Sequence, residues 1–186
     1  MLKGMVFMIF DNDAIIKANR LTRSCGTTNP YRIAQELGIQ IFYMDLSSIK
    51  GMYAYVLRNR YIVLNNNLGE VEQRIVLAHE LGHDQLHRGS CFRAFTDRSS
   101  ILYETHRREI DANYFSAQLL IPDEDFFEML ENEYDYYQMS AEMQVFPELM
   151  MLKVDMLNMQ GHNLKPFDVG SKNFLKKRLS NCNHFN

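Results

Sequence analysis

The stretch RIVLAHELGHDQLH, Arg74 to His87, determines how the rest of the chain can be interpreted. Apolar residues surround its polar ones on nearly every side, which predicts an interior helix rather than a surface helix. His79 and His83 are four residues apart, so they project from one face of that helix about one turn apart. Two imidazoles in this arrangement can bind the same metal ion.

Glu80 lies beside this pair and completes the H-E-x-x-H arrangement of a zinc peptidase, in which the glutamate acts as a general base. The competing interpretation is a structural helix whose buried histidines only make hydrogen bonds. A catalytic zinc takes three protein ligands and keeps one position open for water. A third ligand must therefore come from elsewhere in the chain.

The segment LYETHRREIDANYFSAQLLIP, residues 102–122, has the spacing of a second long helix that ends at Pro122. One stripe of this helix is rich in small residues, and its members are Glu109, Ala112, Asn113, Ser116, Ala117 and Leu120. Small residues would let the two helices approach closely enough for Glu109 to reach the ion. Asn113, one turn further on, is then predicted to hydrogen-bond a histidine Nδ1 and fix its tautomer.

HELGH followed by EIDANYFSAQLLIP resembles the ImmA/IrrE family of metallo-endopeptidases, and the resemblance extends over residues 31–122. It implies that His79, His83 and Glu109 bind one Zn2+ ion per chain in a site of the gluzincin type. It also implies that Glu80 is the catalytic base. Manganese or iron would suit similar ligands, so the ligand set favours zinc without excluding these ions.

The resemblance also implies a biological role. Compact members of the family cut a helix-turn-helix repressor of a phage or integrative element and so relieve repression. The predicted function is therefore a zinc-dependent endopeptidase that cleaves a specific cytoplasmic protein, expected to be such a transcriptional repressor. Two alternatives stay open from the residues: a metal-binding regulator that acts on its partner without proteolysis, and a metal-stabilised scaffold.

The predicted fold class is α+β, because strands precede most of the helices. Three segments rich in β-branched and aromatic residues, 39–46, 52–59 and 60–66, predict a small antiparallel three-stranded sheet packed on a helical bundle with a zincin-like active-site helix. Residues 1–133 are predicted to form the metallopeptidase core, and residues 134–186 a helical extension of the same domain. The last strand, 60–66, is expected to be a sheet edge to which an extended substrate adds.

Composition limits the possible partners and the cellular compartment. The net charge is −3, so no overall basic field attracts nucleic acid, and direct nucleic-acid binding is not expected. No stretch approaches the roughly 20 apolar residues that span a bilayer, and no export signal is recognisable, so a cytoplasmic protein is expected. Cys25, Cys91 and Cys182 have no disulfide or zinc-knuckle spacing and are expected to be free thiols.

Two further expectations concern the surroundings of the site. His87 continues the four-residue spacing of the histidines, but a catalytic zinc already has its ligands, so a supporting role is favoured over metal binding. A hydrogen-bond donor for the tetrahedral oxyanion is also needed, and His106 and Tyr114 are the candidates.

Overall fold

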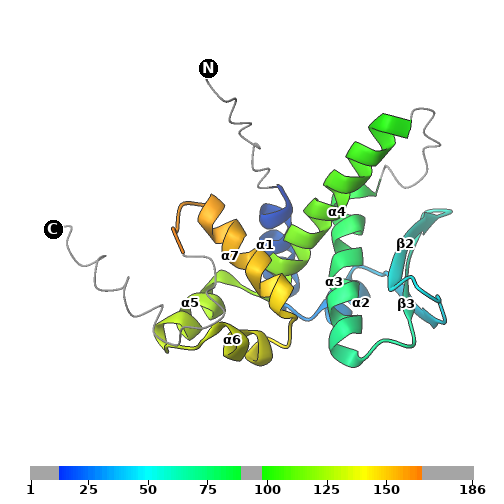
Figure 1. Cartoon of the computed structure of the whole chain (residues 1–186). Helices are drawn as coiled ribbons and strands as arrows, with labels where there is room; N and C mark the ends of the chain where they lie inside the picture. Colours follow the sequence, from blue (N-terminus) through cyan, green and yellow to red (C-terminus); the bar gives the residue numbers. More distant parts are fainter. Residues whose placement is uncertain (1–12, 89–97, 165–186) are drawn as a thin grey trace, which may run out of the picture.

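The computed structural model describes residues 13–88 and 98–164, with side chains described from residue 107 onward in the second range (Figure 1). In chain order the elements are α1 (Asp13–Cys25), α2 (Pro30–Glu36), β1 (Gln40–Met44), β2 (Gly51–Val56), β3 (Asn59–Asn65), α3 (Glu70–His87), α4 (Arg98–Leu120), α5 (Asp123–Glu131), α6 (Tyr136–Glu142) and α7 (Pro147–Met159). The predicted α+β class is confirmed.

Helix α3 is the central element of the part of the chain that the structure describes. Figure 1 shows it between the sheet on one side and α4 on the other, with α1 and α7 packed against α4. Its apolar residues Leu77, Ala78 and Leu81 are fully buried, as the sequence predicted for an interior helix. Glu70 and Glu72 lie in its first turn, where acidic side chains favour the positive end of the helix.

The sheet corrects the sequence prediction in one respect. Its strand order is β1-β3-β2, with β2 antiparallel and β1 parallel to β3, so the sheet is mixed rather than fully antiparallel. Strands β2 and β3 are antiparallel neighbours and form a hairpin. After β1 the chain forms β2 at the far edge of the sheet and then returns as β3 between β1 and β2. The pairing of β3 with β1 is non-local, and this is why a simple succession of antiparallel strands was wrong.

The strand order also overturns the predicted substrate edge. Strand β3 is paired on both sides along its length, so it cannot accept an added strand, whereas β2 is an edge of the described sheet. The face of β3 that packs on the helices buries Ile62 and Leu64 completely. The opposite face of the sheet leaves Phe42 and Met52 exposed.

The shorter helices agree with the sequence in part. The sequence NPYRIAQELG, residues 29–38, favours a short helix with Pro30 near its start and Gly38 as its stop. Helix α2 does begin at Pro30, is capped by the Asn29 side chain, and is followed by Gly38 with a positive φ. The sequence SAEMQVF, residues 140–146, suggests a further short helix. Helix α6 begins four residues earlier, at Tyr136, because Asp135 and Gln138 form a capping box at its start. The sequence GSCFRAFTDRSS, residues 89–100, indicates a loop. Most of this segment lies outside the described residues, and α4 already begins at Arg98.

Two other sequence expectations concern residues that are described only in part. No helix within residues 13–88 and 98–164 is long and apolar enough to cross a membrane. Cys25 is a free, partly buried thiol, while Cys91 and Cys182 lie outside the described residues.

Candidate metal centre

Three side chains from α3 and α4 converge on one point. The Nε2 atoms of His79 and His83 lie 3.1 Å apart. The carboxylate of Glu109, on α4, lies 3.2 Å from His79 Nε2 and 3.5 Å from His83 Nε2. The structure therefore brings together the three residues that the sequence proposed as metal ligands.

The spacing of these donor atoms suits a single metal ion. Zinc binds histidine nitrogen and carboxylate oxygen at about 2.0–2.2 Å, and a tetrahedral arrangement then separates its ligand atoms by roughly 3.3 Å. The three donors all lie within 4.8 Å of one another, and their contacts bracket that separation. The donor set fits zinc in both chemistry and spacing.

Asn113 supplies a second reason to expect a cation at this point. Its Oδ1 lies 2.9 Å from His79 Nδ1, and because an amide oxygen only accepts, Nδ1 carries the hydrogen. In the neutral form of the ring, which is the form that binds a metal, His79 Nε2 is then a bare lone pair that faces a carboxylate oxygen 3.2 Å away. Two electron-pair donors at this distance repel each other unless a cation lies between them.

Burial keeps the nearby imidazoles neutral. The pKa of His83 is lowered to about 4, mainly by burial and next by the neighbouring His79. The pKa of His87 is also lowered to about 4, mainly by burial and next by the positive charge of Arg108. Near neutral pH both rings are uncharged, which is the form that binds a metal.

Glu80 lies beside the convergence point and is 7% exposed. Its pKa is raised to about 7, mainly because burial penalises the carboxylate and next because of the negative charge of Glu109, while a backbone hydrogen bond from Tyr53 lowers it. A carboxyl group with a pKa near 7 can both accept and release a proton at neutral pH, as a general acid–base residue must.

Two glycines let the neighbours approach α3 closely. A Cβ at Gly51 of β2 would lie 2.5 Å from Val76 Cγ1 and 3.4 Å from Glu80 Oε1. A Cβ at Gly82 of α3 would lie 3.0 Å from the Cα of Ala112 on α4. The first approach brings the edge strand β2 against Glu80, and the second brings α4 near enough for the Glu109 carboxylate to reach the histidines.

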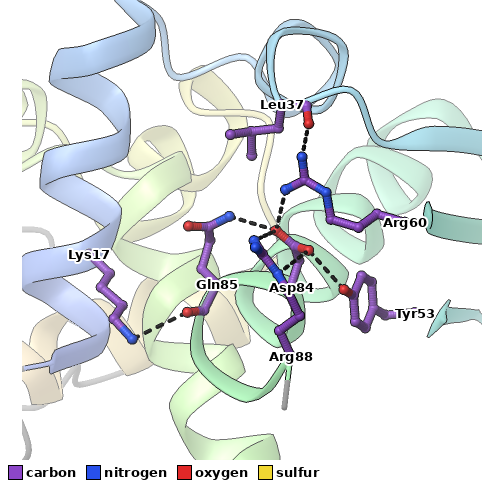
Figure 2. Close-up of polar contacts among 7 residues, drawn as sticks. All are labelled: Lys17, Leu37, Tyr53, Arg60, Asp84, Gln85 and Arg88. Carbon is purple, nitrogen blue, oxygen red and sulfur yellow. Dashed lines mark hydrogen bonds and ion pairs between the residues drawn. The ribbon is translucent and has the colours of Figure 1, made fainter. Parts of the chain in front are cut away.

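Asp84 anchors helix α3 to the sheet and to α2 (Figure 2). Its carboxylate is fully buried and accepts hydrogen bonds from Tyr53 Oη at 2.8 Å, Arg60 Nη1 at 3.3 Å and Arg88 Nη2 at 2.9 Å. Arg60 also donates to the carbonyl oxygen of Leu37 at the end of α2. One buried carboxylate thus connects the metal-site helix to β2, β3 and α2.

Tyr53 contacts α3 at two successive turns. Its backbone hydrogen-bonds the Glu80 carboxylate, while its hydroxyl donates to Asp84. The sequence analysis did not identify either Tyr53 or Asp84 as part of this arrangement. A usable signal was present, because an aspartate on a helix predicted to be interior is almost never buried without partners.

An open pocket surrounds the three convergent side chains. It is lined by Gly51, Met52, Tyr53, His79, Glu80, His83, His87, Arg108 and Glu109. Tyr114, one of the two oxyanion candidates, directs its hydroxyl toward Met159 of α7, 4.0 Å away, and does not line this pocket. The side chain of His106 lies outside the described residues.

Comparison with known proteins agrees with this geometry. Residues 34–153 match the Peptidase_M78 model, described as an IrrE N-terminal-like domain. The uncharacterized immunity region protein 2 of Bacillus phage phi105 is 39% identical over 112 residues, which cover 59% of this chain and 70% of that relative. Metallopeptidase ImmA of Bacillus subtilis (strain 168) is 29% identical over 116 residues, covering 61% of this chain and 66% of that relative.

A solved structure shares the fold. A Mycobacterium tuberculosis transcriptional regulator superposes with a TM-score of 0.57 at 17% identity, over 78% of this chain and 47% of that one. The chain therefore spans about two thirds of the curated relatives' length and about half of the solved structure's. Because the family model covers most of the chain, the resemblance noted in the sequence is confirmed, and the chain belongs to the Peptidase_M78, or IrrE N-terminal-like, family of metallopeptidases.

Proposed function

We propose that this protein is a zinc-dependent endopeptidase that cleaves a specific protein. His79, His83 and Glu109 are the proposed zinc ligands, and Glu80 is the proposed catalytic base. The observation that carries the proposal is the convergence of both histidine Nε2 atoms on the Glu109 carboxylate, at 3.2 and 3.5 Å, beside a buried glutamate.

The mechanism assigns a separate task to each side chain. A bound zinc ion supplies Lewis acidity, which polarises a peptide carbonyl and acidifies water. Glu80 takes the proton of the attacking water and passes it to the leaving amine, which its raised pKa of about 7 suits. Asn113 holds His79 in the tautomer that leaves Nε2 free. No covalent bond between enzyme and substrate forms.

The pocket wall offers a place for an extended peptide. Strand β2 is an edge of the described sheet, and its residues Gly51, Met52 and Tyr53 line the pocket beside Glu80. A peptide that adds to a sheet edge makes backbone hydrogen bonds and places alternate side chains on opposite faces. We therefore assign substrate binding to β2. The sequence analysis had suggested β3 instead.

We infer a helix-turn-helix transcriptional repressor as the substrate. The inference rests on the family resemblance and on the name of one relative, which is an immunity region protein of a phage. The matched solved structure is called a transcriptional regulator, which is compatible with a role in gene regulation.

The decisive variant is Glu80→Gln, which keeps the size of the side chain but cannot accept a proton. It should retain stoichiometric zinc and lose about 10²–10⁴-fold in cleavage rate. Purified protein is incubated with helix-turn-helix repressors encoded in the same genomic region, and new N-termini are detected by mass spectrometry. The control is Glu72→Gln on the same helix, which removes only the surface ion pair with Lys50.

The same variant separates cleavage from binding. Cleavage by Glu80→Gln at the wild-type rate would refute the assigned base. If the variant relieved repression as well as the wild type and no fragments formed in either case, the protein would instead be a metal-binding regulator that acts without proteolysis. Loss of zinc from the Glu109→Ala variant would support the ligand set in both cases.

A further inference from the structure

The two proposed histidine ligands are held in different ways. His79 Nδ1 faces the side-chain oxygen of Asn113, an ordinary acceptor. His83 Nδ1 faces a second imidazole instead, and lies 3.2 Å from His87 Nδ1. His87 Nε2 in turn lies 3.5 Å from the Asp111 carboxylate of α4. These contacts form a row of side chains that runs from the proposed metal site through the rings of His83 and His87 to the Asp111 carboxylate.

The positions of the ring hydrogens in this row of side chains are determined by the metal at one end and by Asp111 at the other. If His83 Nε2 binds a metal, its one hydrogen must be on Nδ1, and this hydrogen can only be donated to His87 Nδ1. His87 Nδ1 is then an acceptor, so the hydrogen of that ring is on Nε2. That hydrogen points at Asp111, which as a carboxylate accepts it.

The opposite arrangement is disfavoured at both ends. A hydrogen on His87 Nδ1 would be donated to His83 Nδ1, which would place the other hydrogen on His83 Nε2 and block that atom as a ligand. It would also leave the bare lone pair of His87 Nε2 facing the Asp111 carboxylate. Arg107 Nε, which can only donate, lies 4.0 Å from the same carboxylate oxygen, so that oxygen faces donors rather than acceptors.

His87 is not itself placed to bind the ion. Its Nδ1 is directed at the far nitrogen of His83 and its Nε2 at Asp111, whereas the metal donors converge on Glu109. His83 and His87 side chains are 16% and 11% exposed, so water does not readily replace either contact.

We propose that His87 and Asp111 are positioning residues that hold His83 in its metal-binding tautomer and orientation. This inference rests on the proposed metal site and extends it by two residues. An outer partner of a metal-bound histidine typically contributes about 10- to 100-fold to metal affinity. The contribution of His87 should fall in that range.

The test compares zinc affinities by competition with a chromophoric chelator. His87→Phe keeps a planar ring but removes both nitrogens, and should weaken zinc binding by about 10- to 100-fold. His87→Gln offers a carbonyl oxygen to His83 Nδ1 and should recover most of that loss. Asp111→Asn should weaken binding by a smaller factor, because the amide no longer dictates the tautomer of His87. His162→Phe, a histidine packed on Phe127, is the matched control and should leave zinc affinity unchanged.

A spectroscopic measurement distinguishes this role from simple packing. In the zinc-loaded protein, long-range ¹H–¹⁵N correlation of the imidazoles should show His87 with its hydrogen on Nε2 and an accepting Nδ1. Wild-type zinc affinity in His87→Phe, equal losses in the Phe and Gln variants, or a hydrogen on His87 Nδ1 would each overturn the inference. Circular dichroism of the metal-free variants checks that each one folds.

Failure of the underlying metal site would look different. In that case wild-type protein would bind zinc weakly, and the affinity would be indifferent to His83→Ala and Glu109→Ala. Tight zinc binding that depends on those two residues but not on His87 or Asp111 would overturn only the present inference.

Discussion

Replacing Gly82 by alanine tests whether the close approach of α3 and α4 builds the metal site. The added Cβ would lie 3.0 Å from Ala112 Cα, 3.2 Å from its carbonyl oxygen and 3.3 Å from its Cβ. Carbon atoms pack best at about 3.5–4.0 Å, so α4 must retreat by roughly 0.5 Å. Two of the three contacted atoms belong to the backbone, so no side-chain rotation can relieve the contact.

The effect on folding should be small because two terms oppose each other. Overpacking a close contact costs about 1–3 kcal/mol. Replacing a glycine inside a helix by alanine gains about 1 kcal/mol. The free energy of unfolding of the metal-free protein should therefore decrease by about 0–2 kcal/mol, measured by urea denaturation.

The effect on zinc should be larger, because Glu109 lies three residues from Ala112 on the helix that is displaced. Metal–ligand distances tolerate only about ±0.2 Å. A displacement of roughly 0.5 Å should weaken zinc binding by about tenfold or more, which is about 1.4 kcal/mol. Competition with a chelator measures this directly, and the additional stability that zinc confers should shrink by the same amount.

The matched control is Gly69→Ala at the start of the same helix, where a Cβ would meet nothing within 4 Å. It should leave zinc affinity unchanged. Adding Ala112→Gly to Gly82→Ala removes only one of the three contacts and should restore little of the affinity. Wild-type zinc affinity in Gly82→Ala, or full recovery in the double variant, would refute the argument that backbone proximity places Glu109.

Three further predictions concern the surroundings of the site. Gly51→Ala, with its Cβ 2.5 Å from Val76 Cγ1, should lower the free energy of unfolding by about 1–3 kcal/mol but spare zinc affinity, which urea denaturation and zinc titration would show. Asp84→Ala removes the fully buried acceptor of three hydrogen bonds from partly exposed side chains, two of them cationic, and should lower the free energy of unfolding by about 3 kcal/mol in urea denaturation. A loss below about 1 kcal/mol would contradict the anchoring role. Burial lowers the pKa of Lys153 in the folded protein below its usual 10.5. Between the folded and the unfolded pKa the unfolded chain binds more protons, so the free energy of unfolding of the wild type relative to Lys153→Met should rise with pH up to about 10.5. A difference that does not depend on pH would contradict this.

The sequence predicted the local parts of this structure well. The spacing of four residues between His79 and His83 is a property of one helix, and the position of Gly38 after α2 is a property of one turn. Small residues on α4 predicted that α3 and α4 pack closely, and Ala112 does lie against Gly82. These features depend on residues a few positions apart or on the size of one side chain.

The parts that were missed depend on contacts between distant segments. The parallel pairing of Ile41 with Ile62 requires β3 to enter the sheet between β1 and β2, and nothing in the spacing of the strands indicates this. The partners of Asp84 come from β2 and β3 as well as from its own helix, so its burial could not be derived from α3 alone. A glycine at the start of a strand was the one available sign that β2 approaches another element closely.

This division between local and distant contacts also applies to the proposed chemistry. Glu80 and His79 are adjacent on α3, so the backbone positions of the proposed base and the first proposed ligand relative to each other are set within that helix. The neighbours set the remaining two features: α4 brings Glu109 to the histidines through the Gly82 contact, and β2 brings the pocket wall to Glu80 through Gly51. Because these two approaches lie on different sides of α3, zinc affinity and the position of the substrate strand should be separable by mutation. A Gly51→Ala variant that lost zinc as severely as Gly82→Ala would show that the two sides are mechanically coupled.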